Sequence, residues 1–141
     1  MTPLAALQRA LAGEHAAVYV YGVLGGRVSS STHPSLAALI RSAYVTHRAR
    51  RDRLTAMVAA AGGDPVAADV SYHLPNRART PHDLEAAARV TERRCAAVYA
   101  TTVASTSRSD RHWAVDALSD AAVRLLSLGG SPDPWPGADE L

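Results

Sequence analysis

Two ionisable residues occupy positions where an amphipathic helix would bury apolar side chains. Glu14 lies between Leu11 and Val18 at steps of three and four residues, which is the spacing along one face of an α-helix. His47 interrupts an apolar face in the same way in a later segment. A carboxylate on a buried face needs a charged or hydrogen-bonding partner. Glu14 and His47 are therefore the first candidates for a functional site.

Proline and glycine divide the chain into the helices that must position these residues. Proline is favoured at the first helical position, where its missing N–H costs nothing, and glycine often ends a helix because it adopts the left-handed conformation. Three cap-proline pairs mark starts and three glycine pairs mark ends: Thr2-Pro3, His33-Pro34 and Thr80-Pro81, then Gly25-Gly26, Gly62-Gly63 and Gly129-Gly130. A polar run at 105–110 breaks the last long segment. We expect helices near residues 3–25, 34–62, 81–106 and 109–129, and no strand.

The connection lengths predict an all-α, antiparallel four-helix bundle. The first and last connections are a few residues long, so the helices that they join are antiparallel neighbours. Residues 63–80 form a long link with apolar anchors expected at Val66, Val70 and Leu74. A helix of about 28 residues is about 42 Å long, whereas this link can reach about 60 Å when extended. One long crossover between the second and third helices is the ferritin-like arrangement.

This bundle is expected to comprise residues 1–130, followed by a proline-rich tail at 131–141. The tail cannot be helical because proline recurs in it, and we expect it to dock on the bundle through Trp135.

The crossover also predicts which side chains lie at one height. Antiparallel pairing brings Glu14 to the height of His47, and the crossover brings His47 to the height of Glu92. If the fourth helix runs antiparallel to the third, Arg124 lies at the same height, with Asp120 one helical turn away. We expect these side chains to converge at the middle of the bundle.

This set contains part of the pattern that holds two metal ions in di-iron carboxylate proteins. That pattern uses a Glu from each of two helices and a Glu-x-x-His from each of the other two. Here Tyr44 lies three residues before His47, and the fourth predicted helix has no Glu-x-x-His. Arg124 would place a fixed positive charge where a second metal should sit. We expect a degenerate di-metal site, in which Glu14, His47 and Glu92 could ligate at most one iron, manganese or zinc ion.

The same residues also allow interpretations without a metal. Glu14 could pair with Arg50, Arg51 or Arg124 as a structural carboxylate. The ion-pair network would then consist of Glu14, Arg51, Asp120 and Arg124. Alternatively, tyrosines near this height could line a small-ligand site between the helices. The four candidates are Tyr19, Tyr21, Tyr44 and Tyr99.

Composition limits the remaining classes of function. The 141 residues are 48% hydrophobic, which fits one globular domain. Cys95 is the single cysteine, so an intramolecular disulfide and a cysteine-based zinc site are excluded. The longest uncharged stretches have thirteen residues, short of the roughly 18 needed to span a bilayer. We find no pattern of a secretory signal at the start and expect a cytoplasmic protein.

The basic residues do not form a nucleic-acid signature. All fifteen are arginine, and against thirteen acidic residues they leave a net charge of +2. The run at residues 47–53 is rich in arginine, but a helix distributes these side chains around its circumference and no aromatic residue is interleaved. We expect a solvated face and no nucleic-acid or membrane partner.

Three segments resemble one known family. They are Leu4 to Gly22, the run Tyr44-Val-Thr-His47-Arg-Ala-Arg-Arg51-Asp52, and Leu74-Pro75 in the crossover. The chain resembles the small, uncharacterised ferritin-like domain family of high-GC bacteria over about residues 4–128. The resemblance implies a ferritin-like bundle of unassigned activity, and it supplies neither a substrate nor a firm cofactor.

We therefore expect a binding or assembly module that is not an enzyme, with a single-metal carboxylate-histidine protein as the alternative. Alanine-rich helix surfaces, together with Trp113 and Trp135, predict a homodimer because one small domain would leave apolar surface uncovered.

Overall fold

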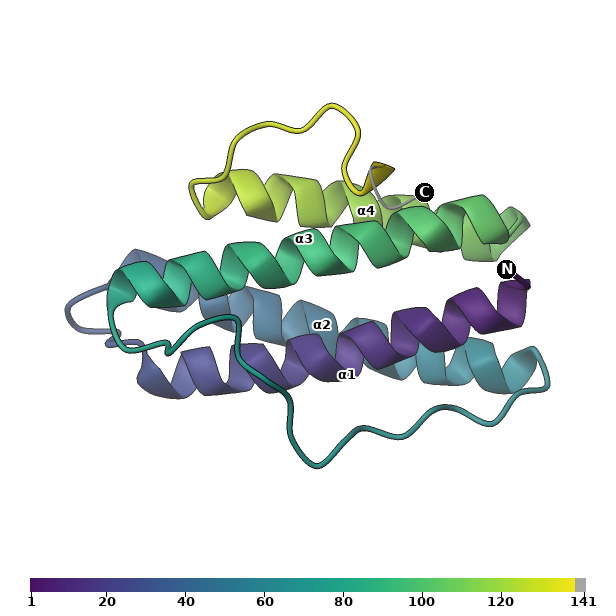
Figure 1. Cartoon of the computed structure of the whole chain (residues 1–141), viewed down its shortest axis with the longest axis horizontal. Coiled ribbons are helices and arrows are strands. Elements are labelled where there is room, and N and C mark those ends of the chain that lie inside the picture. The colour runs from purple at the N-terminus through teal and green to yellow at the C-terminus, as the bar shows by residue number, and fades with distance from the viewer. Residues whose placement is uncertain (139–141) are drawn as a thin grey trace.

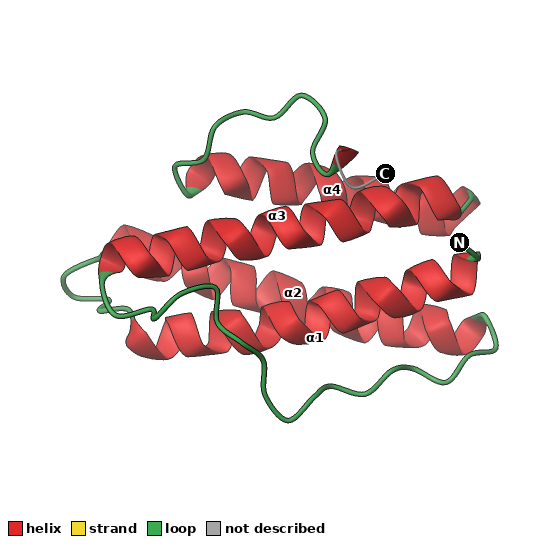
Figure 2. Cartoon of the chain, in the orientation of Figure 1, coloured by secondary structure: helices red, strands yellow, loops and turns green. Residues whose placement is uncertain are grey.

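Four long helices lie side by side and make up most of the chain (Figure 1). The computed structural model describes residues 1–138, so the last three residues of the predicted tail lie outside the described part. The helices are α1 (Pro3–Arg27), α2 (Pro34–Ala60), α3 (Pro81–Ser105) and α4 (Arg108–Ser127). No strand occurs among the described residues (Figure 2). The predicted all-α four-helix architecture is confirmed.

The helix starts follow the proline signals. Each of the first three helices begins at its predicted proline. Thr80 and Asp83 form a capping box, in which the Asp83 N–H donates to the Thr80 hydroxyl and the Thr80 N–H donates to the Asp83 carboxylate, both at 3.1 Å. The backbone hydrogen bonds from Thr80 and Arg79 lower the pKa of Asp83. His33 occupies the predicted N-cap position of α2, but its side chain makes no capping hydrogen bond.

Two of the three predicted glycine stops are confirmed. Gly62 and Gly129 follow α2 and α4 with φ angles of +80° and +78°, the left-handed conformation that ends a helix. The pair Gly25 and Gly26 does not end α1, which continues to Arg27. Neither of these two glycines adopts a positive φ, so the helical hydrogen bonds pass through them. As a result, α1 exposes glycine on its surface.

Small side chains hold three pairs of helices close together. The pairs α1–α2, α3–α4 and α1–α3 pack closely, and buried alanines occur in all four helices. One apolar cluster around Leu24, Ile40 and Leu84 fills one end of the bundle, and a second around Leu11 and Leu54 fills the other. Within the described residues, α2 and α4 are not one of these closely packed pairs. The layer between the two apolar clusters contains the candidate site.

The crossover runs along the outside of α1 to reach the start of α3 (Figure 1). Two of its three predicted anchors are wrong, because Val66 is 39% exposed and Val70 is fully exposed. Leu74 does pack on the core. Polar contacts replace the missing anchors: the Val66 N–H donates to the Gln8 side chain at 2.9 Å, and the Val66 carbonyl lies 2.9 Å from a ring nitrogen of His15. The link is therefore held by α1 through hydrogen bonds.

The tail docks on α3 at a glycine, and the predicted docking through Trp135 is wrong. The Trp135 side chain is 77% exposed. Gly137 has a φ of +73°, and a Cβ atom placed there would lie 2.6 Å from the Ala96 carbonyl oxygen. Only glycine allows such close approach of two backbones.

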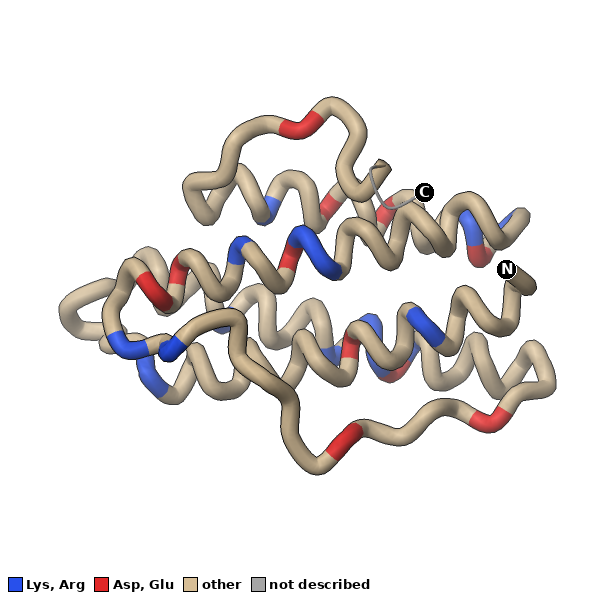
Figure 3. The backbone as a smooth tube through the Cα atoms, viewed as in Figure 1, with Lys and Arg blue, Asp and Glu red and all other residues tan. Residues whose placement is uncertain are grey.

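None of the four helices, all of which lie within residues 1–138, is long and apolar enough to cross a membrane. Acidic and basic residues are interspersed along the helices (Figure 3).

Candidate functional site

Three ionisable side chains meet in the middle of the bundle, each from a different helix. Glu14 of α1, His47 of α2 and Glu92 of α3 have no exposed surface. The Nδ1 atom of His47 lies 2.7 Å from Glu14 Oε2, and its Nε2 atom lies 3.1 Å from Glu92 Oε1. The structure thus brings together the three residues that the sequence places at one height.

Two buried tyrosines complete this centre. The Tyr21 hydroxyl donates to Glu92 Oε1 at 2.6 Å, and the Tyr99 hydroxyl donates to Glu14 Oε1. The Tyr21 ring also stacks on the imidazole of His47, with 5.2 Å between the ring centroids. Burial is the main cause that raises the pKa of both tyrosines, so both hydroxyls keep their protons as donors.

His47 carries the positive charge of this centre. Burial by itself lowers its pKa, but hydrogen bonds to Glu14 and Glu92 outweigh that effect and raise the pKa to about 9. At neutral pH the imidazole is therefore protonated and donates both N–H groups to carboxylate oxygens. We call Glu14, His47, Glu92, Tyr21 and Tyr99 the inner cluster.

A second set of charges surrounds the inner cluster on the side of α4. Arg124 Nε lies 3.5 Å from Glu92 Oε1, and Arg124 Nη2 donates to Asp120 Oδ2 at 3.2 Å. Arg50 donates to the same Asp120 oxygen at 2.8 Å and to the Tyr99 hydroxyl at 3.4 Å. Partial burial acts to raise the pKa of Asp120, but Arg50 and Arg124 outweigh it and lower that pKa. We call Arg50, Asp120 and Arg124 the outer triad.

The outer triad bridges the gap between α2 and α4. Arg124 donates to the Ser42 and Thr46 hydroxyls at 3.4 and 3.3 Å. Two buried polar atoms have no hydrogen-bond partner within the described part of the chain, Glu92 Oε2 and Arg124 Nε. These contacts link α2 to α4 through polar side chains.

One residue of the predicted ion-pair network lies outside it. Arg51 pairs with the adjacent Asp52 at 2.7 Å and makes no contact with Glu14. Each residue of a helix turns by about 100°, so Arg50, three positions after His47, shares its face while Arg51 points away. Arg50 therefore occupies the place predicted for Arg51.

The four predicted tyrosines separate into two groups. Tyr21 and Tyr99 belong to the inner cluster, as hydrogen-bond donors to the glutamates. Tyr19 lies against Tyr72 of the crossover, with 5.5 Å between ring centroids. Tyr44 lies at the surface, where the Arg48 guanidinium is 5.6 Å from its ring centre. These two tyrosines do not contact the carboxylates.

Two hydroxyl groups of α2 that accept hydrogen bonds from Arg124 were not predicted from the sequence. Ser42 and Thr46 are four residues apart, and Arg50 follows after four more. This spacing places the three on one stripe of α2, beside the stripe of His47, and it was a usable signal.

The comparisons with known proteins agree with this architecture. The family described as "Domain of unknown function (DUF4439)" matches residues 6–140. The chain belongs to this family. This DUF4439 domain is similar to the crystal structure of a conserved hypothetical protein, rv2844, from Mycobacterium tuberculosis, at 31% identity. The match covers 93% of each chain with a TM-score of 0.81.

A second solved structure shares the fold of this DUF4439 domain. It is described as ferritin like, diiron-carboxylate proteins from Bacillus anthracis str. Ames, and it matches at 17% identity with a TM-score of 0.78. The match covers 90% of this chain and 92% of that one. No curated protein sequence matches the chain. The ferritin-like fold and the uncharacterised family predicted from the sequence are confirmed.

The donor set of the DUF4439 domain does not fit the two-metal centre that di-iron carboxylate proteins build in such a bundle. A ligating histidine offers one ring nitrogen to the metal and uses only the other as a donor, whereas both ring nitrogens of His47 face carboxylates. Arg124 adds a permanent positive charge 3.5 Å from Glu92. Within residues 1–138, no group of three or more His, Cys, Asp and Glu side chains is arranged to hold a metal ion.

Proposed function

We propose that this DUF4439 domain is a non-catalytic binding or assembly module in which an ion-pair layer occupies the place of a di-metal centre. The observation that carries the proposal is the pairing of His47 with two glutamates through both ring nitrogens. In this arrangement a protonated imidazole and the Arg124 guanidinium supply the positive charge that metal ions supply in a di-iron bundle.

The ion-pair layer has a structural role in this proposal. A buried ion pair seldom adds net stability over apolar packing, but it penalises arrangements in which either charge loses its partner. Glu14, His47, Glu92 and Arg124 come from four different helices. Sliding any one helix by a turn would leave a buried charge unpaired, so the layer fixes the register of the bundle.

Elemental analysis tests the absence of a resident metal. The wild-type protein is purified without chelator and its iron, manganese and zinc are measured by mass spectrometry. We expect far less than one metal ion per chain. One transition metal ion per chain that is lost in Glu14→Ala and kept in Asp116→Ala would overturn the proposal and favour the single-metal alternative. Asp116 is the matched control because its side chain is 70% exposed.

We also propose that two copies of the chain assemble through α4. Three exposed apolar side chains support this: Val115, Val123 and Leu126 are 42%, 61% and 47% exposed. Helical geometry places them within about 80° of one another on the outer face of α4. Burial of such side chains favours association, since each removes apolar surface from water.

Light scattering at micromolar concentration measures the assembly. We expect twice the 14.8 kDa mass of one chain for the wild type and for Val70→Lys, which alters an exposed valine on the crossover. Val123→Lys is expected to shift the protein to the mass of one chain. A wild-type protein with the mass of a single chain would refute the proposed dimer.

A further inference from the structure

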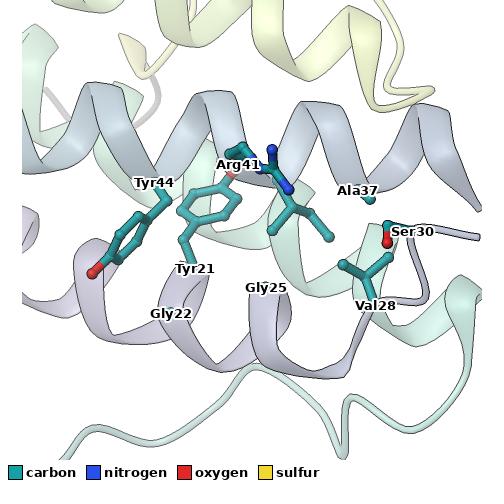
Figure 4. Close-up of a pocket in the computed structure, with 9 residues that line it drawn as sticks. Tyr21, Gly22, Gly25, Val28, Ser30, Ala37, Arg41 and Tyr44 are labelled. Carbon is teal, nitrogen blue, oxygen red and sulfur yellow. The ribbon is translucent and has the colours of Figure 1, made fainter.

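A hollow of about 390 Å³ lies between the C-terminal half of α1 and the N-terminal half of α2. The rings of Tyr21 and Tyr44 form one wall, Gly22 and Gly25 of α1 form the floor, and Arg41 extends over it from α2 (Figure 4). Its volume falls within the range of roughly 300–1,000 Å³ that is common for small-ligand sites.

The glycines of the floor are not required by the packing of α1 on α2. A Cβ atom at Gly22 would lie 3.7 Å from the Tyr44 ring, and one at Gly25 would lie 3.7 Å from Ile40, both ordinary contacts. Alanine would therefore fit at either position. A glycine inside a helix costs about 0.5–1 kcal/mol relative to alanine. The packing accordingly leaves this cost unexplained, whereas a need for open space above the floor explains it.

The charge of the hollow is positive. Arg41 forms no salt bridge or hydrogen bond with any residue of the described chain, and no acidic residue lines the hollow. Arg48 lies over the ring of Tyr44 and adds a second positive charge at this edge. A guanidinium is planar and binds a carboxylate through two parallel hydrogen bonds.

We propose that the hollow binds a small aromatic carboxylate. The Arg41 guanidinium holds the carboxylate, and the flat apolar body lies over Gly22 and Gly25 against the ring of Tyr44, where an aromatic pair is favourable. This inference rests on the proposed function, because it names the class of ligand that the binding module takes.

Calorimetric titration with 2-naphthoate tests the site, and 2-naphthamide serves as the neutral ligand of the same shape. We expect saturable binding of 2-naphthoate to the wild type at one site per chain. We expect 2-naphthamide to bind at least roughly tenfold more weakly, because it cannot form the charge-assisted pair. Equal affinities for the two compounds, or no saturable binding of 2-naphthoate, would overturn the inference.

Two pairs of variants locate the binding. Arg41→Gln is expected to weaken 2-naphthoate binding roughly tenfold and to leave 2-naphthamide unaffected, while Arg53→Gln on the same helix changes neither. Gly25→Met fills the hollow and is expected to abolish binding of both compounds. Gly26→Met is its matched control, because Gly26 faces open space and does not line the hollow. Both variants replace glycine with methionine, which is a good helix former. Circular dichroism checks that they fold.

A second cavity of about 330 Å³ between α1 and α3 is the competing location. It is lined by Gly13, Cys95 and the crossover residue Tyr72, among others. Binding that Gly13→Met removes and Gly25→Met leaves intact would overturn the assignment to the α1–α2 hollow. The metal analysis decides the proposed function separately, since a metal-free protein that fails to bind 2-naphthoate refutes only the ligand class.

Discussion

The inner cluster and the outer triad are adjacent parts of one polar network, but they differ in their access to water. Glu14, His47 and Glu92 are fully buried, whereas the Asp120 side chain of the outer triad is 43% exposed. Ionic interactions are strong where water is excluded and weak where it screens them. Substitutions of similar residue types are therefore expected to lower the free energy of unfolding more in the inner cluster than in the outer triad.

The largest effect is expected from removing one carboxylate of the inner cluster. Glu14→Ala leaves the Nδ1 N–H of His47 and the Tyr99 O–H without an acceptor in the core, and breaking a buried ion pair in this way costs about 3–5 kcal/mol of the free energy of unfolding. Urea denaturation measures this loss. Asp116→Ala, at an exposed site on α4, is the control and should stay within about 0.5 kcal/mol of the wild type. Equal losses of the free energy of unfolding in the two variants would contradict the prediction that burial makes the inner cluster more sensitive to substitution than the surface.

The pH dependence of the free energy of unfolding reports the contribution of His47. Its pKa is raised from an ordinary value of 6.5 to about 9 in the folded protein, so the folded state binds the proton more tightly than the unfolded state. The resulting stabilisation is complete below pH 6.5 and is lost as the pH rises through about 9. The loss over this window is about 3 kcal/mol.

Urea denaturation at pH 6 and at pH 9 tests this prediction. His47→Gln has no group that titrates at this position, so its free energy of unfolding should change much less over the same window. An unchanged wild-type stability between these pH values would contradict a protonated His47 in the core.

An intermediate effect is expected at Arg124, where the two parts of the network meet. Arg124→Met keeps most of the side-chain volume but removes the charge beside Glu92, which retains Tyr21 and His47 as partners. We expect a loss of about 1–3 kcal/mol in the free energy of unfolding. A loss as large as that of Glu14→Ala would place Arg124 in the inner cluster.

The smallest effect is expected at the exposed carboxylate of the outer triad. Asp120→Asn removes the charge shared by Arg50 and Arg124, and water replaces most of that interaction, so the loss is about 1 kcal/mol or less. Thermal unfolding at low and at 1 M salt distinguishes this site further. The difference between Asp120→Asn and wild type should shrink at high salt, while that of Glu14→Ala should persist.

The helix boundaries and the height of the candidate site were accessible from the sequence because they depend on local rules. Proline fixed three starts, positive-φ glycine fixed two ends, and a constant rise of about 1.5 Å per residue aligned the helices. The stop predicted at Gly25 failed because glycine permits the left-handed conformation without requiring it. The anchors predicted at Val66 and Val70 failed because the hydrogen bonds of Gln8 and His15 position the link instead.

The hydrogen-bond partners within the site were harder to predict from the sequence than the residues that belong to it. The choice between Arg50 and Arg51 depends on the rotation of α2 about its own axis, which one residue changes by about 100°. The roles of Tyr21 and Tyr99 depend on hydrogen bonds to glutamates of another helix. These glutamates lie 71 and 85 residues away along the chain.

The sequence by itself determined four helices, one long crossover and a set of ionisable residues facing inward, because periodicity, capping and chain length are local properties. Only the tertiary structure decided that His47 gives both nitrogens to glutamates, that Arg50 takes the place of Arg51, and that glycines of α1 open a hollow beside Arg41. The physical reason is that a hydrogen bond depends on distances of a few tenths of an ångström and on its angle. Helical spacing, in contrast, sets only the height and approximate direction of a side chain.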